Sequence, residues 1–568
     1  MSLSIGLDTA TKALRAQQLV VDVASHNIAN AQTPGFSRQR AELTADGFPA
    51  GGMMHNSLFG QVGTGVDASQ VRRVRDLFLD FQARTASGNQ AQYDAYTANL
   101  SQAQLTFNDP SASGFSAIMS TFFNAWQDVV NDPQSSTARV ALVNATTTLT
   151  SNLNRSATDL ANLRQNVNSQ VVGLQDQINS SAQQIASLNQ QITMIEASGN
   201  KANDLRDQRD LLLDQLSKIG QVSSSEQASG SIDVYFGNHS LVSGTTANSV
   251  QVVNDPVHAG MQKLQFTADG QDLTTANGSL RGLMDVRDLA IPQVQKELDS
   301  LASGLINGVN ALHVQGKDQH GNAGLPFFTG ATAIDIGVNA AIASDPSLIA
   351  ASQTGAAGDG ANALAIAKLE GTGAIDTSQP GIAAGQPLTG AQIAGVVQAG
   401  ALAAGTYHMV ANGSNLDLQD ASGAVVGTAT LAAIAPNSAG AITFTSGGIP
   451  VVAIAVSAGS SGYTAASQLA DFTAAAPANT IVIGTNPNDR YNNMVSTLGA
   501  QVAQAQGFQS ANQLLSQNIQ AQRQSVSGVN IDEEVTNMTS AQHAYQAAAK
   551  VISTIDGMLD TLINKTLI

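Results

Sequence analysis

Apolar residues recur every seven positions at both ends of the chain. In the N-terminal segment these residues are Leu7, Leu14, Val21 and Ile28, and in the C-terminal segment they are Ile531, Met538, Tyr545, Ile552 and Leu559. A seven-residue repeat of apolar side chains forms one stripe along an α-helix. The sequence therefore predicts an amphipathic helix at each end, and little local sequence is present to cover either stripe.

The N-terminal stripe stops at a turn motif. This motif comprises Asn27, Asn30, Thr33, Pro34, Gly35 and Phe36. Pro34 fixes φ at about −65°, and Gly35 can adopt the positive φ that a type II turn needs. The first helix is therefore expected to end before Thr33, where the chain is redirected into a globular body. Asn27 and Asn30 are expected to cap the helix or to hydrogen-bond near the turn, and a plain helix C-terminus is the alternative.

The clearest apolar periodicity lies within 160–195, where apolar residues are spaced alternately by three and four positions. This is coiled-coil spacing. A second amphipathic segment, 203–219, follows a short break and can fold back on the first. The sequence therefore predicts a helical hairpin within 150–219.

The rest of the chain mixes strand-like and helical patterns. Residues 231–253 alternate as strands do, and 278–313 return to a helical pattern. Between Lys368 and Arg490 there is no Lys or Arg, and short β-like runs lie in Ala-, Gly- and Thr-rich sequence. A separate, mostly-β domain over 371–486 is predicted. Low-complexity disorder is the rival interpretation, although alternating Val and Ile runs can bury a face.

Together these segments predict a multidomain α+β protein. Its terminal helices pair as a coiled coil, its central domain is a bundle of long helices with some β-structure, and its inserted domain is mostly β. The predicted domains are a terminal coiled-coil assembly domain (1–35 with 525–568), a helical-bundle-rich body (36–370 with 487–524, including the hairpin 150–219) and the inserted outer domain (371–486).

Composition excludes several classes of protein. The net charge is −17, which argues against nucleic-acid binding because a phosphate backbone requires a basic face. The chain has no cysteine, so disulfides and cysteine metal sites are excluded. No apolar run is long enough to span a membrane, and the first residues do not have the pattern of a secretory signal peptide. If the protein works outside the cell, it is expected to leave without signal cleavage.

No motif in the sequence points to catalysis. His313 and His320 are not spaced as in HExxH, and no phosphate loop, GxGxxG fingerprint or GxSxG elbow is present. Asp207, Arg209 and Asp210 resemble a catalytic cluster, but they are expected to form the charged, solvent-exposed face of a helix. The protein is therefore expected to be no enzyme and to hold no cofactor or metal.

The terminal stripes predict an assembly function. An apolar stripe must be buried, and the first helix can pack against the last. A pair with one narrow seam is marginally stable alone, so we expect other copies or other proteins to pack around it. The alternative is that both ends dock on their own domains and assemble nothing. The expected interface residues are Ile5, Leu7, Leu14, Val21 and Ile28 of the first helix and Ile531, Met538, Tyr545, Ile552 and Leu559 of the last.

Both ends of the chain resemble one family. The segments "SHNIANAQTPGFSRQ" (25–39) and "SGVNIDEEVTNMTSAQHAYQAAAKVI" (527–552) are similar to the terminal signatures of flagellar rod, hook and hook-associated axial proteins. Two further segments, "NDLRDQRDLLLDQLS" (203–217) and "GSLRGLMDVRD" (278–288), narrow the resemblance to the hook-associated protein 1 family. The resemblance covers both ends and much of the body, whereas 371–486 matches nothing recognisable.

The resemblance implies a structural protein of the bacterial flagellum. Such a protein is exported unfolded by the flagellar type III apparatus after a transient cytoplasmic stage, and forms the junction ring between hook and filament outside the cell. The implied partners are other copies of the chain, the hook protein, the second hook-associated junction protein and a cytosolic export chaperone on the C-terminal helix, at 538–562. Two alternatives stay open. A flagellar hook or distal-rod protein shares the terminal signatures but would lack the long hairpin, and a non-flagellar surface adhesin would explain the β insertion but not the matched ends.

Overall fold

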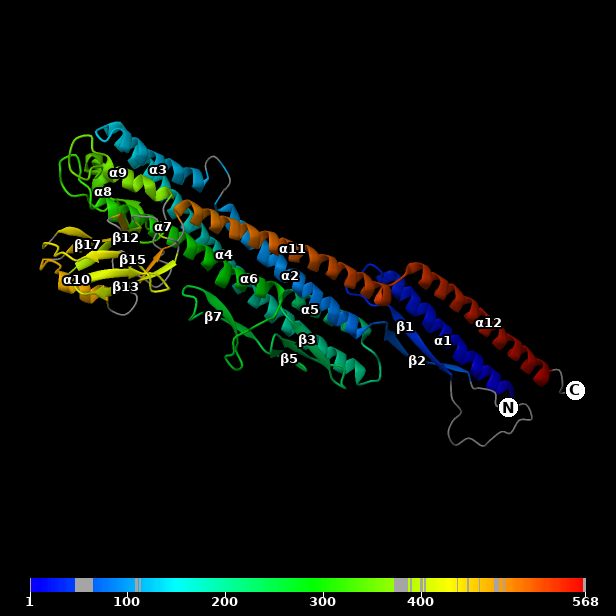
Figure 1. The fold of residues 1–568 in the computed structure, drawn as a ribbon. Coiled ribbons are helices and arrows are strands. Elements are labelled where there is room, and N and C mark those ends of the chain that lie inside the picture. The colour runs from blue at the N-terminus through cyan, green and yellow to red at the C-terminus, as the bar shows by residue number, and fades with distance from the viewer. Residues whose placement is uncertain are drawn as a thin grey trace. The chain divides into compact units, whose positions relative to one another are not determined.

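The computed structural model describes residues 2–45, 65–107, 111, 114–371, 387–388, 391–398, 402, 405–436, 438–446, 449–458, 460–473, 480–483 and 486–564. Long helices and several antiparallel sheets alternate along the chain (Figure 1), which confirms the predicted multidomain α+β class. The chain divides into two compact units, unit 1 (1–97, 168–285 and 505–568) and unit 2 (98–167 and 286–504). The division into terminal, body and inserted domains remains a prediction.

Unit 1 contains both ends of the chain. Its helices are α1 (Ser2–Asn30), α5 (Asn203–Ile219), α6 (Gly278–Asp285), α12 (Ile531–Asn564) and parts of α2 (Leu77–Leu105), α4 (Ser136–Glu196) and α11 (Pro487–Ser527). Its strands are β1 (Gln39–Ala45), β2 (Val66–Arg73), β3 (Val222–Glu226), β4 (Ile232–Phe236), β5 (His239–Ser243), β6 (Thr246–Ala247), β7 (Val250–Asn254) and β8 (Gln262–Phe266). They form the ribbons β1–β2 and β7–β8 and a four-stranded antiparallel sheet β3–β4–β5–β6.

The first and last helices of the chain lie side by side (Figure 1). Asn27 Nδ2 donates to Glu534 Oε2 across 3.0 Å, and Ser25 Oγ lies 3.9 Å from Met538 Sδ. Toward the other end of the pair, a Cβ at Gly6 would lie 3.2 Å from the side chain of Ile555. Residue numbers rise along α1 as they fall along α12, so the two helices are antiparallel.

Helix α4 has the apolar seam that the sequence predicts. Leu160, Val167, Val171, Ile178 and Ile185 are all buried. Helix α5 folds back beside the end of α4, where Arg206 makes two bonds of 2.7 and 2.8 Å to Glu196. The seam positions from Leu160 to Ile192 lose contact with water, as the three-four spacing predicts, whereas Ile195 at the end of the predicted pattern is 40% exposed.

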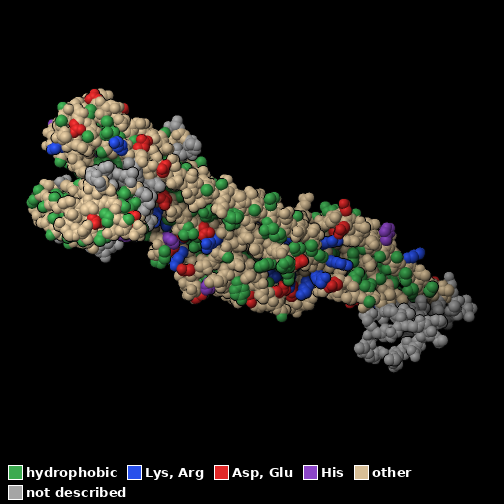
Figure 2. Space-filling view, viewed as in Figure 1, with side chains coloured by type: hydrophobic (Ala, Val, Ile, Leu, Met, Phe, Trp, Pro, Cys, Tyr) green, Lys and Arg blue, Asp and Glu red, His purple; other side chains and the backbone are tan. Residues whose placement is uncertain are grey.

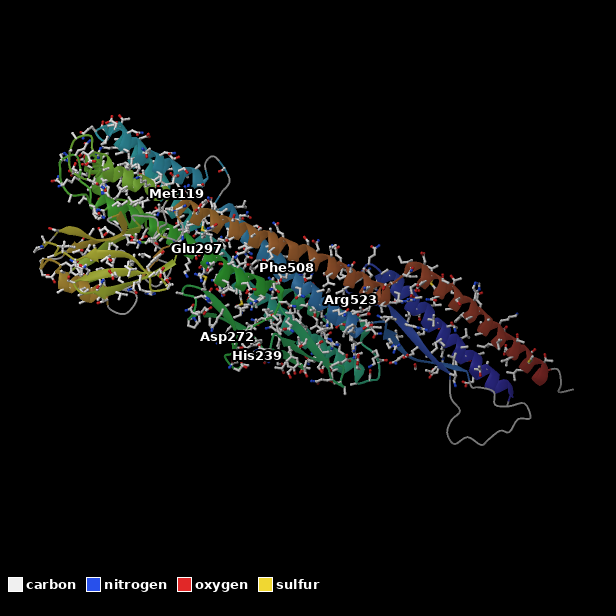
Figure 3. All side chains as sticks on the ribbon, in the orientation of Figure 1. Met119, His239, Asp272, Glu297, Phe508 and Arg523 are labelled. Atoms are coloured by element: carbon white, nitrogen blue, oxygen red, sulfur yellow. The ribbon has the colours of Figure 1, made fainter. Side chains whose placement is uncertain are left out.

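Within unit 1, α2 and α11 run antiparallel. Gln509 of α11 donates to Asp94 of α2 at 2.7 Å, and the rings of Phe508 and Tyr93 lie 5.2 Å apart. Figure 3 labels Phe508 and Arg523 along α11. Arg523 forms an ion pair with Asp80 in the first turn of α2.

Unit 2 has a core rich in aromatic residues. It contains the remaining parts of α2, α4 and α11. Its other helices are α3 (Phe115–Asn131), α7 (Ile291–His313), α8 (Ala340–Ser344), α9 (Ala361–Ala367) and α10 (Ala465–Phe472), with a π-helical segment Val286–Ala290 before α7 and short 3₁₀ turns Pro346–Leu348 and Lys368–Gly371. A ribbon of β9 (Phe328–Thr329) and β10 (Gly337–Val338) lies between α7 and α8 in the chain. Trp126 of α3 packs its ring 5.0 Å from that of Phe327 and 6.2 Å from that of His313.

An eight-stranded antiparallel sheet forms where the mostly-β insertion is predicted. Its strands are β11 (Pro387–Leu388), β12 (Ala391–Gln398), β13 (Gly405–Asn412), β14 (Asn415–Gln419), β15 (Val425–Thr430), β16 (Ala439–Ser446), β17 (Ile449–Ala458) and β18 (Thr480–Ile483), in the order β11–β12–β17–β16–β15–β14–β13–β18. Phe444, Ile454 and Phe472 belong to its buried core. In the described part of the segment, this core favours the folded interpretation over low-complexity disorder.

His313, one of the two histidines whose spacing does not match HExxH, has a structural role in unit 2. Its Nδ1 bonds the Leu325 carbonyl, and its Nε2 accepts the Ala350 N–H at 2.9 Å. Both ring nitrogens are occupied, so the residue holds the end of α7 to the loops that follow. Burial lowers the pKa of His313 to about 4, and the nearby Arg139 charge acts in the same direction.

This lowered pKa predicts acid sensitivity of unit 2. The unfolded chain takes up the imidazole proton at about pH 6.5 and the folded chain only near the lower value, so stability is complete above about pH 6.5 and falls as the pH drops toward 4. The expected loss over that window is about 3 kcal/mol. Urea unfolding of the natural chain and of His313→Gln, measured at pH 8, 6 and 5, checks the prediction. His313→Gln should be less stable than the natural chain at pH 8 and should lose less stability between pH 8 and pH 5. The same pH dependence of stability in both chains would contradict the prediction.

Candidate functional site

The described residues offer no metal centre. No group of three or more His, Asp or Glu side chains could hold a metal ion among them. Nor does any helix in the described part of the chain have the length and apolar character needed to cross a membrane. The candidate for a functional site is therefore the surface around α1 and α12, together with the segment that connects α1 to β1.

The connecting segment is a type II turn. Gly35 has φ of +82°, and the Phe36 N–H donates to the Thr33 carbonyl at 3.2 Å. A Cβ at Gly35 would also lie 3.2 Å from Leu211 of α5. The turn thus needs glycine for its backbone and for its close approach to α5. The ring of Phe36 packs edge-on against His26 of α1 at 5.4 Å.

Asn27 joins the end of α1 to the first strand and to the last helix. Its Nδ2 donates to the Gln39 carbonyl at 2.8 Å, and its Oδ1 accepts the Gln39 N–H at 2.9 Å, so the amide pairs with β1 as another strand would. The same Nδ2 donates to Glu534 at the start of α12. Asn27 is completely buried. Asn30 has a more local role, because its Nδ2 donates to the His26 carbonyl and its Oδ1 accepts from Thr33.

Arg38, directly after the turn, binds the start of the last helix. Its Nε lies 2.7 Å from Glu534 and its Nη1 lies 2.9 Å from Glu533. Its backbone N–H donates to the Ser527 carbonyl at the end of α11. Glu534 is buried and accepts from both Asn27 and Arg38, so this carboxylate holds the start of α12 to the end of α1 and to the segment just after the turn.

A network of four arginines and four aspartates lies beneath the turn. Its closest ion pairs are Arg73 to Asp207 and Asp210, Arg75 to Asp80 and Asp210, Arg84 to Asp214, and Arg523 to Asp80 and Asp214, all at 2.7 or 2.8 Å. The four positive and four negative charges balance. Burial by itself raises the pKa of Asp210, but Arg75, Arg73 and Arg84 together bring that pKa down to about 2.

The network corrects the prediction that Asp207, Arg209 and Asp210 form a solvent-exposed face. Asp207 and Arg209 are buried, and Asp210 is mostly enclosed. Asp207 accepts the backbone N–H and the hydroxyl of Ser37 at 2.9 and 2.7 Å, which fixes the chain just after the turn. The prediction was wrong because the charged partners of Asp207 and Asp210, on β2 and just before α2, lie far away in the sequence, and because Arg209 donates to Asn189 of α4 and to the Gly230 carbonyl.

The predicted stripe residues are only partly covered within one copy. Leu14, Val21, Ile28, Met538, Ile552 and Leu559 are half-buried, Leu7, Ile531 and Tyr545 are exposed, and the side chain of Ile5 lies outside the described residues. The fully buried positions of the pair are mostly small, including Ala10, Ala24 and Ala541. Small residues thus let the helices approach closely, and the exposed surface of Leu7, Ile531 and Tyr545 is left available to other molecules.

Sequence reasoning did not identify Glu534 or the arginines as anchors. Acidic residues in the first turn of a helix, here Asp532, Glu533 and Glu534, are favoured by the helix dipole in any case. One signal was present, because Glu534 occupies the stripe position that Ala541 and Ile555 occupy in later turns. A carboxylate at an otherwise apolar stripe position indicates a buried, paired charge.

Three parts of the chain match known flagellar protein families. Residues 100–328 match the family described as "Flagellar hook-associated protein FlgK helical domain", residues 520–565 match "Flagellar basal body rod FlgEFG protein C-terminal", and residues 7–36 match "Flagella basal body rod protein". These matches cover the hairpin region and both terminal helices.

Curated relatives align over nearly the full length. Flagellar hook-associated protein 1 of Bacillus subtilis (strain 168) is 27% identical over 600 residues, which cover 99% of this chain and 98% of the relative. Flagellar hook-associated protein 1 of Escherichia coli (strain K12) is 28% identical over 580 residues, which cover 98% of this chain and 99% of the relative. Among solved structures, the flagellar hook junction protein FlgK from Burkholderia pseudomallei matches with 23% identity and a TM-score of 0.41, covering 72% of this chain and 63% of that one.

Proposed function

The chain belongs to the flagellar hook-associated protein 1 family, and we propose that copies of it form the junction ring between hook and filament. It is a structural protein of the flagellum and no enzyme. Family membership removes the surface-adhesin alternative. The hook or distal-rod alternative is disfavoured, because the long helices of the hairpin region match the helical domain of the hook-associated family.

The observation that supports an assembly function is the incomplete cover of the terminal helix pair. Its seam is made largely of small residues, whereas Leu7, Ile531 and Tyr545 remain exposed in a single copy. Burying one Leu or Ile side chain stabilises by roughly 1.5–3 kcal/mol. Packing neighbouring copies around each pair therefore supplies free energy that the isolated chain lacks. The proposed interface is the stripe set predicted above, from Ile5 to Ile28 and from Ile531 to Leu559.

The chain would be exported unfolded through the flagellar type III apparatus after a transient cytoplasmic stage, during which a chaperone shields the C-terminal stripe. In the assembled flagellum its neighbours would be other copies, the hook protein and a second hook-associated junction protein. A cysteine-free and aromatic-poor chain is compatible with passage in an unfolded state.

The decisive experiment is electron microscopy of cells that lack the gene, together with an assay of filament subunit in the culture medium. Hooks of normal length without filaments, and filament subunit lost to the medium, are expected. Missing hooks would move the protein to the hook or distal rod. Normal flagella would overturn the proposed function.

Substitution within a stripe tests the interface itself. Leu14→Asp or Ile552→Asp is expected to leave the body folded but to block incorporation, because each places a charge where a neighbouring copy packs an apolar surface. Thermal melts by circular dichroism and immunoblots of isolated hooks measure the two effects. Val140→Asp, an equally apolar but exposed residue on α4, is the matched control and should incorporate normally. A stripe variant that incorporates like the control would remove that residue from the interface.

A further inference from the structure

A groove lies between the β1–β2 ribbon and the terminal helix pair. It encloses about 930 Å³ and is lined by α1, both strands of the ribbon and the first turns of α12. Val20 and Val23 of α1 form part of its apolar floor. Five arginines and two glutamates line it, in a chain whose net charge is −17. Figure 2 shows basic and acidic side chains gathered in the region where Figure 1 places the ribbon. The groove is therefore an unusually basic part of an acidic protein.

Two of these arginines face each other in an unfavourable arrangement. Arg40 of β1 and Arg72 of β2 are direct cross-strand partners. Like charges at directly opposite positions of a strand pair destabilise it. Arg72 has one weak contact, 3.7 Å from Glu42, with its side chain 70% exposed, and Arg40 is exposed without an ion pair to any described residue. The other three arginines of the groove, at positions 38, 73 and 75, are all paired with carboxylates. The uncompensated positive charge of the groove is thus concentrated on one cross-strand pair.

The opposite flank of the same helix pair carries the complementary features. Asp22 of α1 and Asp532 of α12 are exposed, and neither forms an ion pair with a described residue. With about 100° of rotation per residue, Asp22 lies about 160° around α1 from Val20, and Asp532 lies about 140° around α12 from the groove-lining Asn537. Val535 is 43% exposed and lies about 160° around α12 from Asn537. One copy therefore presents a basic, apolar-floored groove on one side and free carboxylates beside an exposed apolar residue on the other.

We propose that the groove binds the acidic outer flank of a second copy of this chain, with Arg40 and Arg72 meeting Asp22 and Asp532. Such a contact joins two different surfaces of the same protein. Heterologous contacts of this kind repeat from copy to copy and close into rings when the rotation permits. The inference rests on the ring assembly proposed above and identifies the charged contact that holds neighbouring copies in register. Repulsion between Arg40 and Arg72 then destabilises the ribbon in the free chain, and the carboxylates of the second copy offset this repulsion.

Reversing the charge at Arg72 distinguishes a role in the contact between copies from a structural role within one copy. In Arg72→Glu, the new carboxylate faces Arg40, so the unfolding midpoint of the purified chain should not fall. Incorporation into hooks isolated from cells that lack the natural gene should drop by at least about tenfold, because like charges would then meet across the interface. A second reversal, Asp532→Arg, combined with Arg72→Glu in the same chain, should restore incorporation. Arg155→Glu, which changes the charge equally at an exposed position of α4, should incorporate normally.

The outcomes distinguish this inference from the proposed function. If the natural gene restores filaments and Arg72→Glu does so equally well, the groove contact is wrong while the junction function stands. A fall in the unfolding midpoint that accounts for the lost incorporation would make the arginine pair structural and overturn the proposal. Loss without rescue by Asp532→Arg or Asp22→Arg would also overturn it, because the occupant of the groove would then be another molecule. If cells without the gene have normal flagella, the proposed function itself fails.

Discussion

Asp210→Asn should lower the free energy of unfolding of unit 1 by about 3–5 kcal/mol, the usual cost of removing one partner from a buried ion pair. Asp210 lies 2.7 Å from both Arg73 and Arg75 and 3.5 Å from Arg84. Asparagine keeps the shape but removes the negative charge, so three guanidinium groups lose a shared counter-ion. Because the network also positions Ser37 after the turn, loosening of the base of the terminal helix pair should accompany the loss.

Urea unfolding and hydrogen exchange of peptides from α5 measure the effect. Asp176→Asn is the matched control, because Asp176 is an exposed aspartate in the same unit, and its change should stay within about 0.5 kcal/mol. The pH dependence gives a second check. The pKa of Asp210 is depressed to about 2, so the stability it contributes is complete above about pH 4 and is lost as the pH falls from 4 toward 2. Asp210→Asn should lack that part of the stability loss at low pH. If Asp210→Asn destabilises the chain at neutral pH no more than Asp176→Asn does, the network contributes little to stability.

Gly282→Ala should destabilise unit 1 by about 3 kcal/mol, at the upper end of the range for overpacking a close contact. A Cβ at this position would lie 2.2 Å from the Gln92 carbonyl oxygen and 3.2 Å from the Tyr96 amide nitrogen, both on the backbone of α2. Backbone atoms cannot rotate away as a side chain can. Helices α6 and α2 must therefore separate to admit one methyl group.

A second glycine provides the control for this substitution. Gly173 is exposed within α4, and a Cβ there would meet nothing within 4 Å. Gly173→Ala should therefore raise stability by about 0.5–1 kcal/mol through helix propensity alone. Urea midpoints of the two variants should move in opposite directions, with faster hydrogen exchange near Gln92 only in the first. Equal shifts would mean that α2 and α6 are not in tight contact.

Elements with a regular side-chain repeat could be predicted from the sequence alone. The seven-residue stripes predicted α1 and α12, the three-four spacing predicted the seam of α4, and Pro34 with Gly35 predicted the turn. Each of these signals is local, because side-chain periodicity and backbone conformation depend on neighbours within one or two turns. The same locality explains why the alternating runs of 371–486 indicated strands but not their order in the sheet.

The partners of the charged and amide side chains, in contrast, depend on tertiary contacts that the sequence does not show. The sequence could not show that Asp210 of α5 faces Arg73 and Arg75, or that Glu534 receives Asn27, because these partners are separated by more than 100 residues. A charge on an amphipathic helix is usually solvated, so the local rule gave the wrong environment for Asp207 and Arg209. Periodicity determines which face of a helix is apolar, whereas the pairing of buried charges depends on which distant elements the fold brings together.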